Sequence, residues 1–188
     1  MFRAIFLDRD GVLIENRADY VREWSHIQFF PEAIQALAHL HGYKVVIVTN
    51  QSGVGRGLIS LKVAHDINDE LIKLIKENNG HIDGVFMCPH APSDQCNCRK
   101  PNPGLLLQAA EELSLDLSRS WMIGDAWSDL LAGKAAGVRR VALLKTGRGS
   151  DQLLEPRPEG LVDYFVFNDL ADALRAIQKI DDTSTSGQ

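Results

Sequence analysis

The stretch RAIFLDRDG at residues 3–11 joins a short apolar run directly to charged residues. The run 3–7 is typical of a buried strand, and Asp8 and Asp10 follow it at once. Side chains two positions apart in an extended segment share a face, so both carboxylates are expected to enter one cavity, and Gly11 permits a turn directly afterwards. Carboxylates this close repel, and a hard cation such as Mg²⁺ relieves the repulsion. The pair is therefore a candidate magnesium site, with a simple polar turn as the alternative.

Strand and helix patterns alternate along the rest of the chain. Strand patterns recur at 44–49, 84–87, 121–123, 138–143 and 164–167, and helical patterns lie at 31–40, 60–79, 103–113, 128–136 and 170–180. This alternation indicates βαβ units and predicts an α/β fold, a Rossmann-like three-layer sandwich with a mostly parallel central sheet. Ligands of such sheets bind beyond the carboxyl ends of the strands, so the polar clusters that follow the strands should converge at one edge.

Length and charge narrow the class of protein. The 188 residues suit a single domain, expected over 1–180, and the tail 181–188 has no apolar residue and is expected to be disordered. The net charge of -5 argues against binding to nucleic acid or to a membrane surface. No secretory signal or membrane span is visible, and the clustered cysteines favour a reducing compartment, so we expect a cytoplasmic and monomeric protein.

A second polar cluster follows the strand pattern at 44–49. Hydroxyl groups and glycine-freed backbone amides at a strand end suit phosphate oxygens, and an arginine there can add a forked contact. Taken alone, the cluster could also be an ordinary glycine-rich turn, and it lacks the lysine of a Walker loop. The candidate phosphate and substrate contacts in it are Thr49, Asn50, Gln51, Ser52 and Arg56.

All three cysteines of the chain lie close to one histidine. Cys88, His90, Cys96 and Cys98 form a Cys₃His set, which fits tetrahedral Zn²⁺ with no position left for water. A closed coordination shell predicts a structural zinc in an inserted loop; free surface thiols are the alternative.

Two cations and a further carboxylate complete the candidate site. Arg99 and Lys100 come directly after the last cysteine, so a zinc-anchored loop would set where they point. Lys100 can act as a point charge on a phosphoryl group and Arg99 as a forked clamp. Asp125, after the strand pattern 121–123, would reach the metal from a third direction, unless it only caps a helix.

In this order, D-R-D-G at 8–11, Thr49, Lys100 and G-D-x-x-x-D at 124–129 resemble the haloacid dehalogenase-like phosphohydrolase superfamily. The resemblance implies that Asp8 is the nucleophile of an aspartyl-phosphate mechanism and that Asp10 is the general acid/base. It further implies that Thr49 and Lys100 steady the phosphoryl group, and that Asp125 joins Asp8 and Asp10 on Mg²⁺. Asp129 would be an outer partner of the metal site.

Many members of this superfamily carry a cap domain, but the segment between Asp8 and Lys44 is too short for one after Asp8. We therefore expect no separate cap, and loops should supply specificity. The candidates are the zinc loop and the segment that contains Asn16, Asp19 and Tyr20.

The zinc loop resembles the branch of the superfamily that contains heptose bisphosphate and histidinol-phosphate phosphatases. The stretch 49–57, the pair at 20–21 and the triplet at 145–147 favour the heptose enzymes, and Arg56 and Arg99 would suit a doubly phosphorylated sugar. The short spacer from His90 to Cys96 resembles the histidinol-phosphate branch at least as much and leaves histidinol phosphate open as the substrate. Ala126 stands where both kinds of enzyme commonly have a basic residue, so one expected substrate contact is missing.

Two other classes of function are alternatives. A nucleic-acid 3′-phosphatase would share the aspartates but should show a basic, aromatic-lined groove, which the acidic composition does not favour. A non-catalytic zinc-stabilised interaction module would leave Asp8, Asp10, Lys100 and Asp125 without an explanation. The prediction is therefore an Mg²⁺-dependent phosphatase of a small phosphorylated sugar.

Overall fold

The structure is a computed structural model that describes residues 1–17 and 19–185. Its strands are β1 (Ala4–Leu7), β2 (Lys44–Asn50), β3 (Gly84–Cys88), β4 (Trp121–Gly124), β5 (Arg140–Leu144) and β6 (Phe165–Phe167). Its α-helices are α1 (Pro31–Ala38), α2 (Ser52–Gly55), α3 (Leu61–Glu77), α4 (Gly104–Glu112), α5 (Trp127–Ala136), α6 (Gly149–Gln152) and α7 (Leu170–Thr185). Short 3₁₀ helices lie at Trp24–His26, Pro92–Asp94 and Leu117–Arg119.

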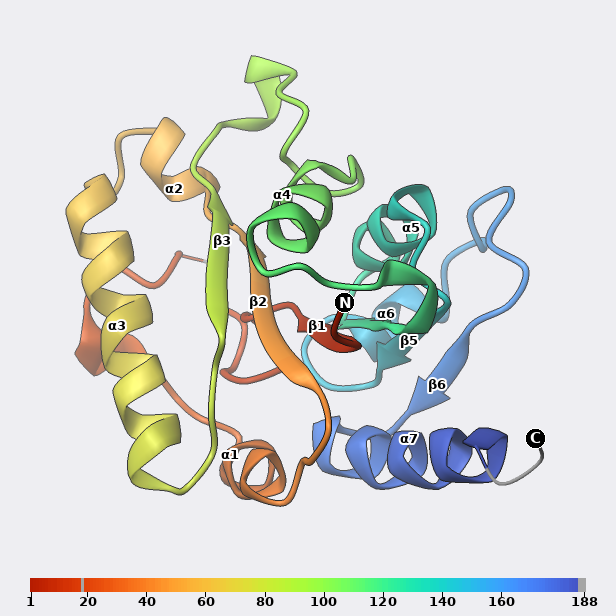
Figure 1. The fold of residues 1–188 in the computed structure, drawn as a ribbon. Helices are drawn as coiled ribbons and strands as arrows, with labels where there is room; N and C mark the ends of the chain where they lie inside the picture. Colours follow the sequence, from red (N-terminus) through yellow and green to blue (C-terminus); the bar gives the residue numbers. More distant parts are fainter. Residues whose placement is uncertain (18, 186–188) are drawn as a thin grey trace.

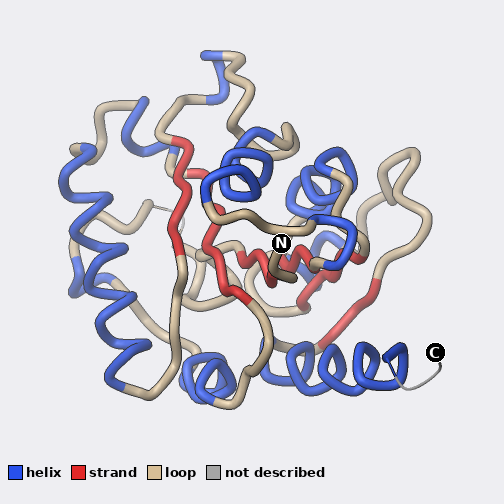
Figure 2. Tube along the Cα trace, in the orientation of Figure 1, coloured by secondary structure: helices blue, strands red, loops and turns tan. Residues whose placement is uncertain are grey.

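The six strands form one parallel sheet in the order β3-β2-β1-β4-β5-β6. Helices lie on both of its faces (Figures 1 and 2). Helices α1, α3 and α7 pack on one face and α4 and α5 on the other, which gives three layers. The predicted α/β sandwich is confirmed.

Strand β1 shows why the sheet needs both helical layers. Its four residues are fully buried and alternate between the two cores: Ile5 and Leu7 face the first, and Ala4 and Phe6 face the second. Successive strand side chains point to opposite faces, so an unbroken apolar run requires cover on each side. The apolar run therefore places β1 in the middle of the sheet, with Asp8 just beyond its carboxyl end.

Helix boundaries follow local signals in most places. Pro31 is the first residue of α1, and the Ser60 side chain accepts a hydrogen bond from the backbone N–H of Val63 at 3.1 Å, which caps α3. The short helices α2 and α6 were not predicted. Each has only four residues, too few for a helical repeat to appear in the sequence.

The expectation that the tail is disordered from residue 181 is wrong for its first five residues. Helix α7 continues to Thr185, and Asp181 is buried. The anchor is polar: the Asp181 carboxylate accepts from the Tyr43 hydroxyl, from Trp121 Nε1 at 3.2 Å and from Arg140 Nη1 at 2.6 Å. The remaining tail residues, 186–188, lie outside the described residues.

The long connection from β1 to β2 carries α1 and the 3₁₀ helix Trp24–His26. Its first part, together with the loops that follow β2, β3, β4 and β5, surrounds the carboxyl edge of the sheet, as described below. No helix within the described ranges is long and apolar enough to cross a bilayer.

Candidate active site

The polar segments that follow the central strands meet around a cavity of about 740 Å³ at the carboxyl edge of the sheet. Asp8 follows β1, Gln51 follows β2, and Lys100 belongs to the loop between β3 and α4. Asp129 lies in the first turn of α5, after β4. All four line the cavity, so the predicted convergence at this edge is confirmed.

Lys100 is the centre of the charge network. Its side chain is 1% exposed, and its Nζ lies 2.9 Å from Asp8 Oδ1 and 2.7 Å from Asp129 Oδ1. The third ammonium proton goes to the backbone carbonyl of Val48 at 2.7 Å. An ammonium has three donors. All three are engaged, so the lysine charge is held against Asp8.

The burial of Asp8 raises its proton affinity. Burial raises the pKa of Asp8 from 3.8 to about 7; Lys100 opposes the rise, and the carboxylates of Asp129, Asp125 and Asp10 add to it. Asp129 and Asp8 in turn outweigh the effect of burial on Lys100 and hold the pKa of that lysine above its usual value. The site therefore carries more negative charge than Lys100 neutralises, which favours a further cation.

Asp125 is fully buried and its carboxylate accepts several hydrogen bonds. The Asn16 side-chain amide donates to Oδ2, and so does the backbone N–H of Arg148 at 2.9 Å. The Arg148 guanidinium forks across both oxygens, with Nε 3.2 Å from Oδ2 and Nη2 2.9 Å from Oδ1.

Two glycines allow the chain to approach Asp125 this closely. Gly11 and Gly147 have φ angles of +84° and +58°, and a Cβ on either would collide with the Asp125 carboxylate. The Thr146 hydroxyl ties the two turns together by donating to the Gly11 carbonyl at 2.6 Å. Both positions thus require glycine for conformation and for space.

Asp10 lines the same cavity, but its carboxylate turns toward other partners. Arg9 Nη2 lies 3.1 Å from both of its oxygens, and Gln51 Nε2 donates to Oδ2 at 2.8 Å. Gln51 Nε2 also lies 2.9 Å from Thr49 Oγ1, while Arg9 Nη1 donates to the Asn68 amide oxygen on α3 at 2.9 Å. The structure therefore brings Asp10 and Thr49 together through Gln51.

The chemistry of the carboxylates suits a divalent ion. Asp8, Asp125 and Asp129 each offer an oxygen, and these oxygens lie within 4.8 Å of one another. Opposite oxygens around Mg²⁺ are about 4.2 Å apart, so the group needs only small adjustments. The Arg148 guanidinium already acts as a cation on Asp125. The Asp10 carboxylate, which was predicted to be a ligand, is not in this group.

Most of the predicted substrate contacts line the cavity, and two do not. Thr49 is buried behind Gln51, and Asp19 is exposed outside the lining. Asn16 uses its side chain to hold Asp125. The predicted residues that line the cavity are Asn16, Tyr20, Asn50, Gln51, Ser52, Arg56 and Arg99.

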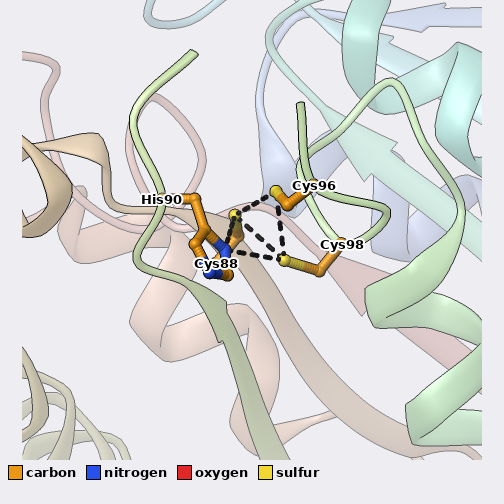
Figure 3. A group of neighbouring side chains, drawn as sticks. All are labelled: Cys88, His90, Cys96 and Cys98. Carbon is orange, nitrogen blue, oxygen red and sulfur yellow. Dashed lines mark hydrogen bonds between the residues drawn. The ribbon is translucent and has the colours of Figure 1, made fainter. Parts of the chain in front are cut away.

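The candidate zinc ligands converge in the loop after β3 (Figure 3). The three Sγ atoms lie 3.2–3.5 Å apart, and His90 Nδ1 lies 3.5 Å from Cys88 Sγ and 3.2 Å from Cys98 Sγ. Zn–S bonds of about 2.3 Å place tetrahedral sulfurs about 3.8 Å apart, slightly wider than this cluster. Four N and S donors turned toward one point are the ligand set that Zn²⁺ prefers, so the residues fit the ion.

Asn50 connects the zinc loop to β2. Its side-chain amide donates to the Lys100 carbonyl at 3.1 Å, and its side-chain oxygen accepts from the Lys100 backbone N–H at 3.1 Å. Within the loop, the Asn102 side chain donates to the Cys96 carbonyl at 2.8 Å. A predicted substrate contact thus also positions the backbone of the lysine beside Asp8.

Two arginines of the site were not predicted to have a role. Arg148 lines the cavity, and Arg9 holds Asp10. Arg17, which also lines the cavity, belongs to the segment that was predicted to supply specificity. A weak signal existed for Arg148, because it follows the strand pattern 138–143 at the same sheet edge as the other clusters. No sequence pattern distinguishes the fully buried Arg9 from a surface arginine.

Comparisons with known proteins agree with this fold and site. The family model described as HAD-hydrolase-like matches residues 97–173, which include Lys100, Asp125 and Asp129. The chain belongs to the haloacid dehalogenase-like hydrolases and is a phosphatase of that family.

Its relatives narrow the class further. It is 40% identical over 178 residues to the D-glycero-β-D-manno-heptose-1,7-bisphosphate 7-phosphatase of Pseudomonas aeruginosa, covering 92% of this chain and 96% of that one. The enzyme of the same name from Escherichia coli K12 is 36% identical over 185 residues, with 94% of each chain covered. The solved D,D-heptose 1,7-bisphosphate phosphatase of B. bronchiseptica, complexed with magnesium and phosphate, superposes with a TM-score of 0.87 at 35% identity, covering 95% of this chain and 99% of that chain.

Proposed function

We propose that this protein removes the 7-phosphate from D-glycero-D-manno-heptose 1,7-bisphosphate in an Mg²⁺-dependent reaction. The observation that carries the proposal is the buried cluster of Asp8, Lys100, Asp129 and Asp125 beneath a cavity lined by arginines. The relatives named above supply the substrate.

Asp8 is the proposed nucleophile. Its carboxylate attacks phosphorus and forms an aspartyl phosphate while the sugar oxygen leaves. Lys100 offsets charge that would otherwise repel the incoming phosphoryl group, and it keeps Asp8 oriented through the contact at 2.9 Å. Mg²⁺, held by Asp8 and Asp125 with an oxygen of Asp10 or Asp129, supplies further charge neutralisation at the phosphoryl oxygens when bound.

Asp10 is the proposed general acid/base. It protonates the departing sugar oxygen and then takes a proton from the water that hydrolyses the aspartyl phosphate. Gln51 and Arg9 hold its carboxylate by donating hydrogen bonds to it. To act in this way, Asp10 must replace one of these contacts with a contact to the leaving oxygen or to water. Gln51 lines the cavity and also contacts Thr49, so its contact with Asp10 is the one that is replaced.

Substrate recognition is assigned to the remaining lining residues. Arg56 and Arg99 can grip a second phosphate that is not cleaved. Asn16, Tyr20, Asn50 and Ser52 line the same cavity and offer hydrogen bonds to sugar hydroxyls. Asp19 would have to move to take part.

The setting of the reaction is also part of the proposal. We infer that the chain works as one domain, with Zn²⁺ on Cys88, His90, Cys96 and Cys98 holding the loop that carries Arg99 and Lys100. Thiolate ligands of this kind are maintained in a reducing compartment, which supports a cytoplasmic location. A small phosphorylated sugar is the proposed partner.

The test compares substrates and variants side by side. Wild type with Mg²⁺ should release phosphate from heptose bisphosphate faster than from histidinol phosphate or fructose bisphosphate. Asp8→Asn should lower kcat at least about 1,000-fold, as removal of a nucleophile does, and Asp10→Asn about 100-fold. Asp163→Asn, an exposed carboxylate remote from the cavity lining, is the control.

Mass spectrometry of acid-quenched enzyme should find the phosphoryl group on Asp8. Full activity of Asp8→Asn would end the mechanism, and a preference for histidinol phosphate would end the substrate assignment while leaving the mechanism in place.

A further inference from the structure

Among the described residues that line the cavity, Arg148 is the cation that contacts the buried Asp125. It comes directly before α6, in the turn after β5, and its side chain is 57% exposed. The backbone N–H of Arg148 is fixed by Asp125 Oδ2 at 2.9 Å, whereas the guanidinium sits on the same carboxylate at the border of the cavity. The side chain can therefore move while its backbone stays in place.

The hydrogen bonds of the Asp125 carboxylate compete with the binding of a divalent ion. It accepts from the Asn16 amide, from the Arg148 backbone and twice from the Arg148 guanidinium. Three of these donors share Oδ2 and only the guanidinium Nη2 contacts Oδ1, so an arriving ion must either displace a donor from Oδ2 or share Oδ1 with the guanidinium. The amide donors are neutral, whereas the guanidinium carries a positive charge that the ion repels. The guanidinium is therefore the group that leaves.

The cavity determines where the released guanidinium can go. Arg56 and Arg99 line the same cavity and already gather positive charge there. A free guanidinium at its border finds its best partner in a phosphate, which it can hold with two parallel hydrogen bonds. The reacting phosphate faces Asp8 and Lys100, so a second phosphate on the substrate is the available partner.

We propose that Arg148 is a specificity-determining residue that exchanges between Asp125 in the ion-free protein and the uncleaved phosphate of a bisphosphate substrate in the ion-bound protein. The proposal rests on the proposed function for the identity of the site. It assigns Arg148 a role beyond the contacts of Arg56 and Arg99, because Arg148 links the metal ligand to substrate recognition.

The exchange has a thermodynamic consequence. The divalent ion and the second phosphate each favour the position in which the Arg148 guanidinium has left Asp125. Each must therefore strengthen the binding of the other by the same factor. A substrate with one phosphate gains nothing from this coupling. The enzyme would thereby discriminate between bisphosphates and monophosphates only when its ion is in place.

The first test measures Mg²⁺ binding without substrate. Arg148→Gln removes the competing charge, so the Mg²⁺ dissociation constant measured by calorimetry should fall about fivefold, the scale of an ion pair whose arginine is more than half exposed. The ion-free melting temperature should fall because Asp125 loses its cation, and the difference from wild type should shrink at saturating Mg²⁺. Arg157→Gln, an exposed arginine outside the cavity lining, is the matched control.

The second test uses two substrates at saturating Mg²⁺. In Arg148→Gln, the ratio of kcat/KM for heptose bisphosphate to that for p-nitrophenyl phosphate should fall about tenfold, the scale of a lost charge-assisted hydrogen bond. Arg148→Lys should recover part of this ratio, since it keeps the charge but not the fork.

The outcomes separate the two proposals. An unchanged or weaker Mg²⁺ affinity in Arg148→Gln would refute the exchange, and an unchanged substrate ratio would refute the recognition role. Failure of the proposed function appears differently, as a wild-type protein that releases phosphate from neither substrate. The calorimetric test of the exchange does not depend on turnover.

Discussion

Asp8 combines two demands that conflict in a buried site. A nucleophilic carboxylate must be ionised, yet burial and the neighbouring carboxylates raise its pKa to about 7 in the absence of an ion. Lys100 at 2.9 Å offsets only part of this effect. In the proposed mechanism, the divalent ion would therefore keep Asp8 ionised as well as hold the phosphate.

This conflict predicts that Mg²⁺ affinity depends on pH. The folded-state pKa of Asp8 is raised above its usual 3.8, so below about pH 7 a proton must leave before the ion binds. Calorimetric titrations should show affinity that rises with pH up to about 7 and then levels off. As the pH rises from about 4 to about 7, the ion-free protein should lose stability, because the folded state binds the Asp8 proton more tightly than the unfolded state does.

The control for this prediction is Asp8→Asn, which lacks the titrating group and should bind Mg²⁺ with a much weaker pH dependence from about pH 5 to about pH 8. Equal affinity of the wild type at about pH 5 and about pH 8 would contradict the assignment of Asp8 as a metal ligand with a raised pKa.

Gly147 is a second position with a specific requirement. Its φ of +58° and the collision of an added Cβ with the Asp125 carboxylate both disfavour any larger residue. Gly147→Ala should lower Mg²⁺ affinity and kcat together, since the turn that carries Arg148 must move away from Asp125. Gly160→Ala is a matched control, because Gly160 has a similar φ of +80° but open space around it. It should lose stability without losing Mg²⁺ affinity; equal Mg²⁺ affinities in the two variants would contradict the steric argument.

Among the elements, the loop between β3 and α4 has the largest effect on the site. It supplies His90, Cys96 and Cys98, which join Cys88 at the end of β3, and then Arg99 and Lys100. Asn50 of β2 holds the backbone of Lys100 from the other side. Since the loop has little regular structure, the Cys₃His cluster and Asn50 together determine where the Lys100 ammonium lies.

Cys96→Ser should therefore affect both the proposed zinc site and the catalytic site. Elemental analysis should find less than one zinc per chain, because three remaining ligands bind Zn²⁺ more weakly. Phosphatase activity should fall about tenfold or more, since outer partners of a catalytic group typically contribute this much. Ser93→Ala, a change at an exposed position of the same loop, is the control. Zinc-free wild-type protein with full activity would refute the role of the loop.

At the level of the whole chain, helix α7 is tied to the sheet by both apolar and polar contacts. Leu170, Leu174 and Ile177 pack in the core, and Asp181 accepts hydrogen bonds from β4, β5 and the residue that precedes β2. This node lies near the start of the strands, at the end of the sheet opposite the cavity.

Asp181→Ala should lower the free energy of unfolding by about 3 kcal/mol, because the buried donors of Tyr43 and Trp121 and the charge of Arg140 lose their shared acceptor. Chemical denaturation measures the change, and activity at room temperature should remain. Asp163→Ala, at an exposed position, should change stability by less than about 0.5 kcal/mol. Similar losses in the two variants would contradict the role of Asp181 as a buried anchor.

Much of this architecture can be predicted before any coordinates are known. The apolar run 3–7 and the β-branched run 44–49 predict central strands, and polar residues after them predict the functional edge, because both signals are local and periodic. The Cys₃His set is equally local. The start of the tail departs from its prediction because its anchor, Asp181, is a polar residue whose partners are distant in the sequence.

The amino-acid sequence alone determined the sheet, its buried centre and the set of acids, cations and thiols at its carboxyl edge. It could do so because periodicity and spacing are properties of residues that are close together in the chain. Only the tertiary structure decided which of these groups pair. It placed Lys100 between Asp8 and Asp129, turned Asp10 toward Arg9 and Gln51, and brought Arg148 onto Asp125. The physical reason is that charge pairing depends on distances of about 3 Å between residues far apart in the chain, and burial then sets how strongly each pair interacts.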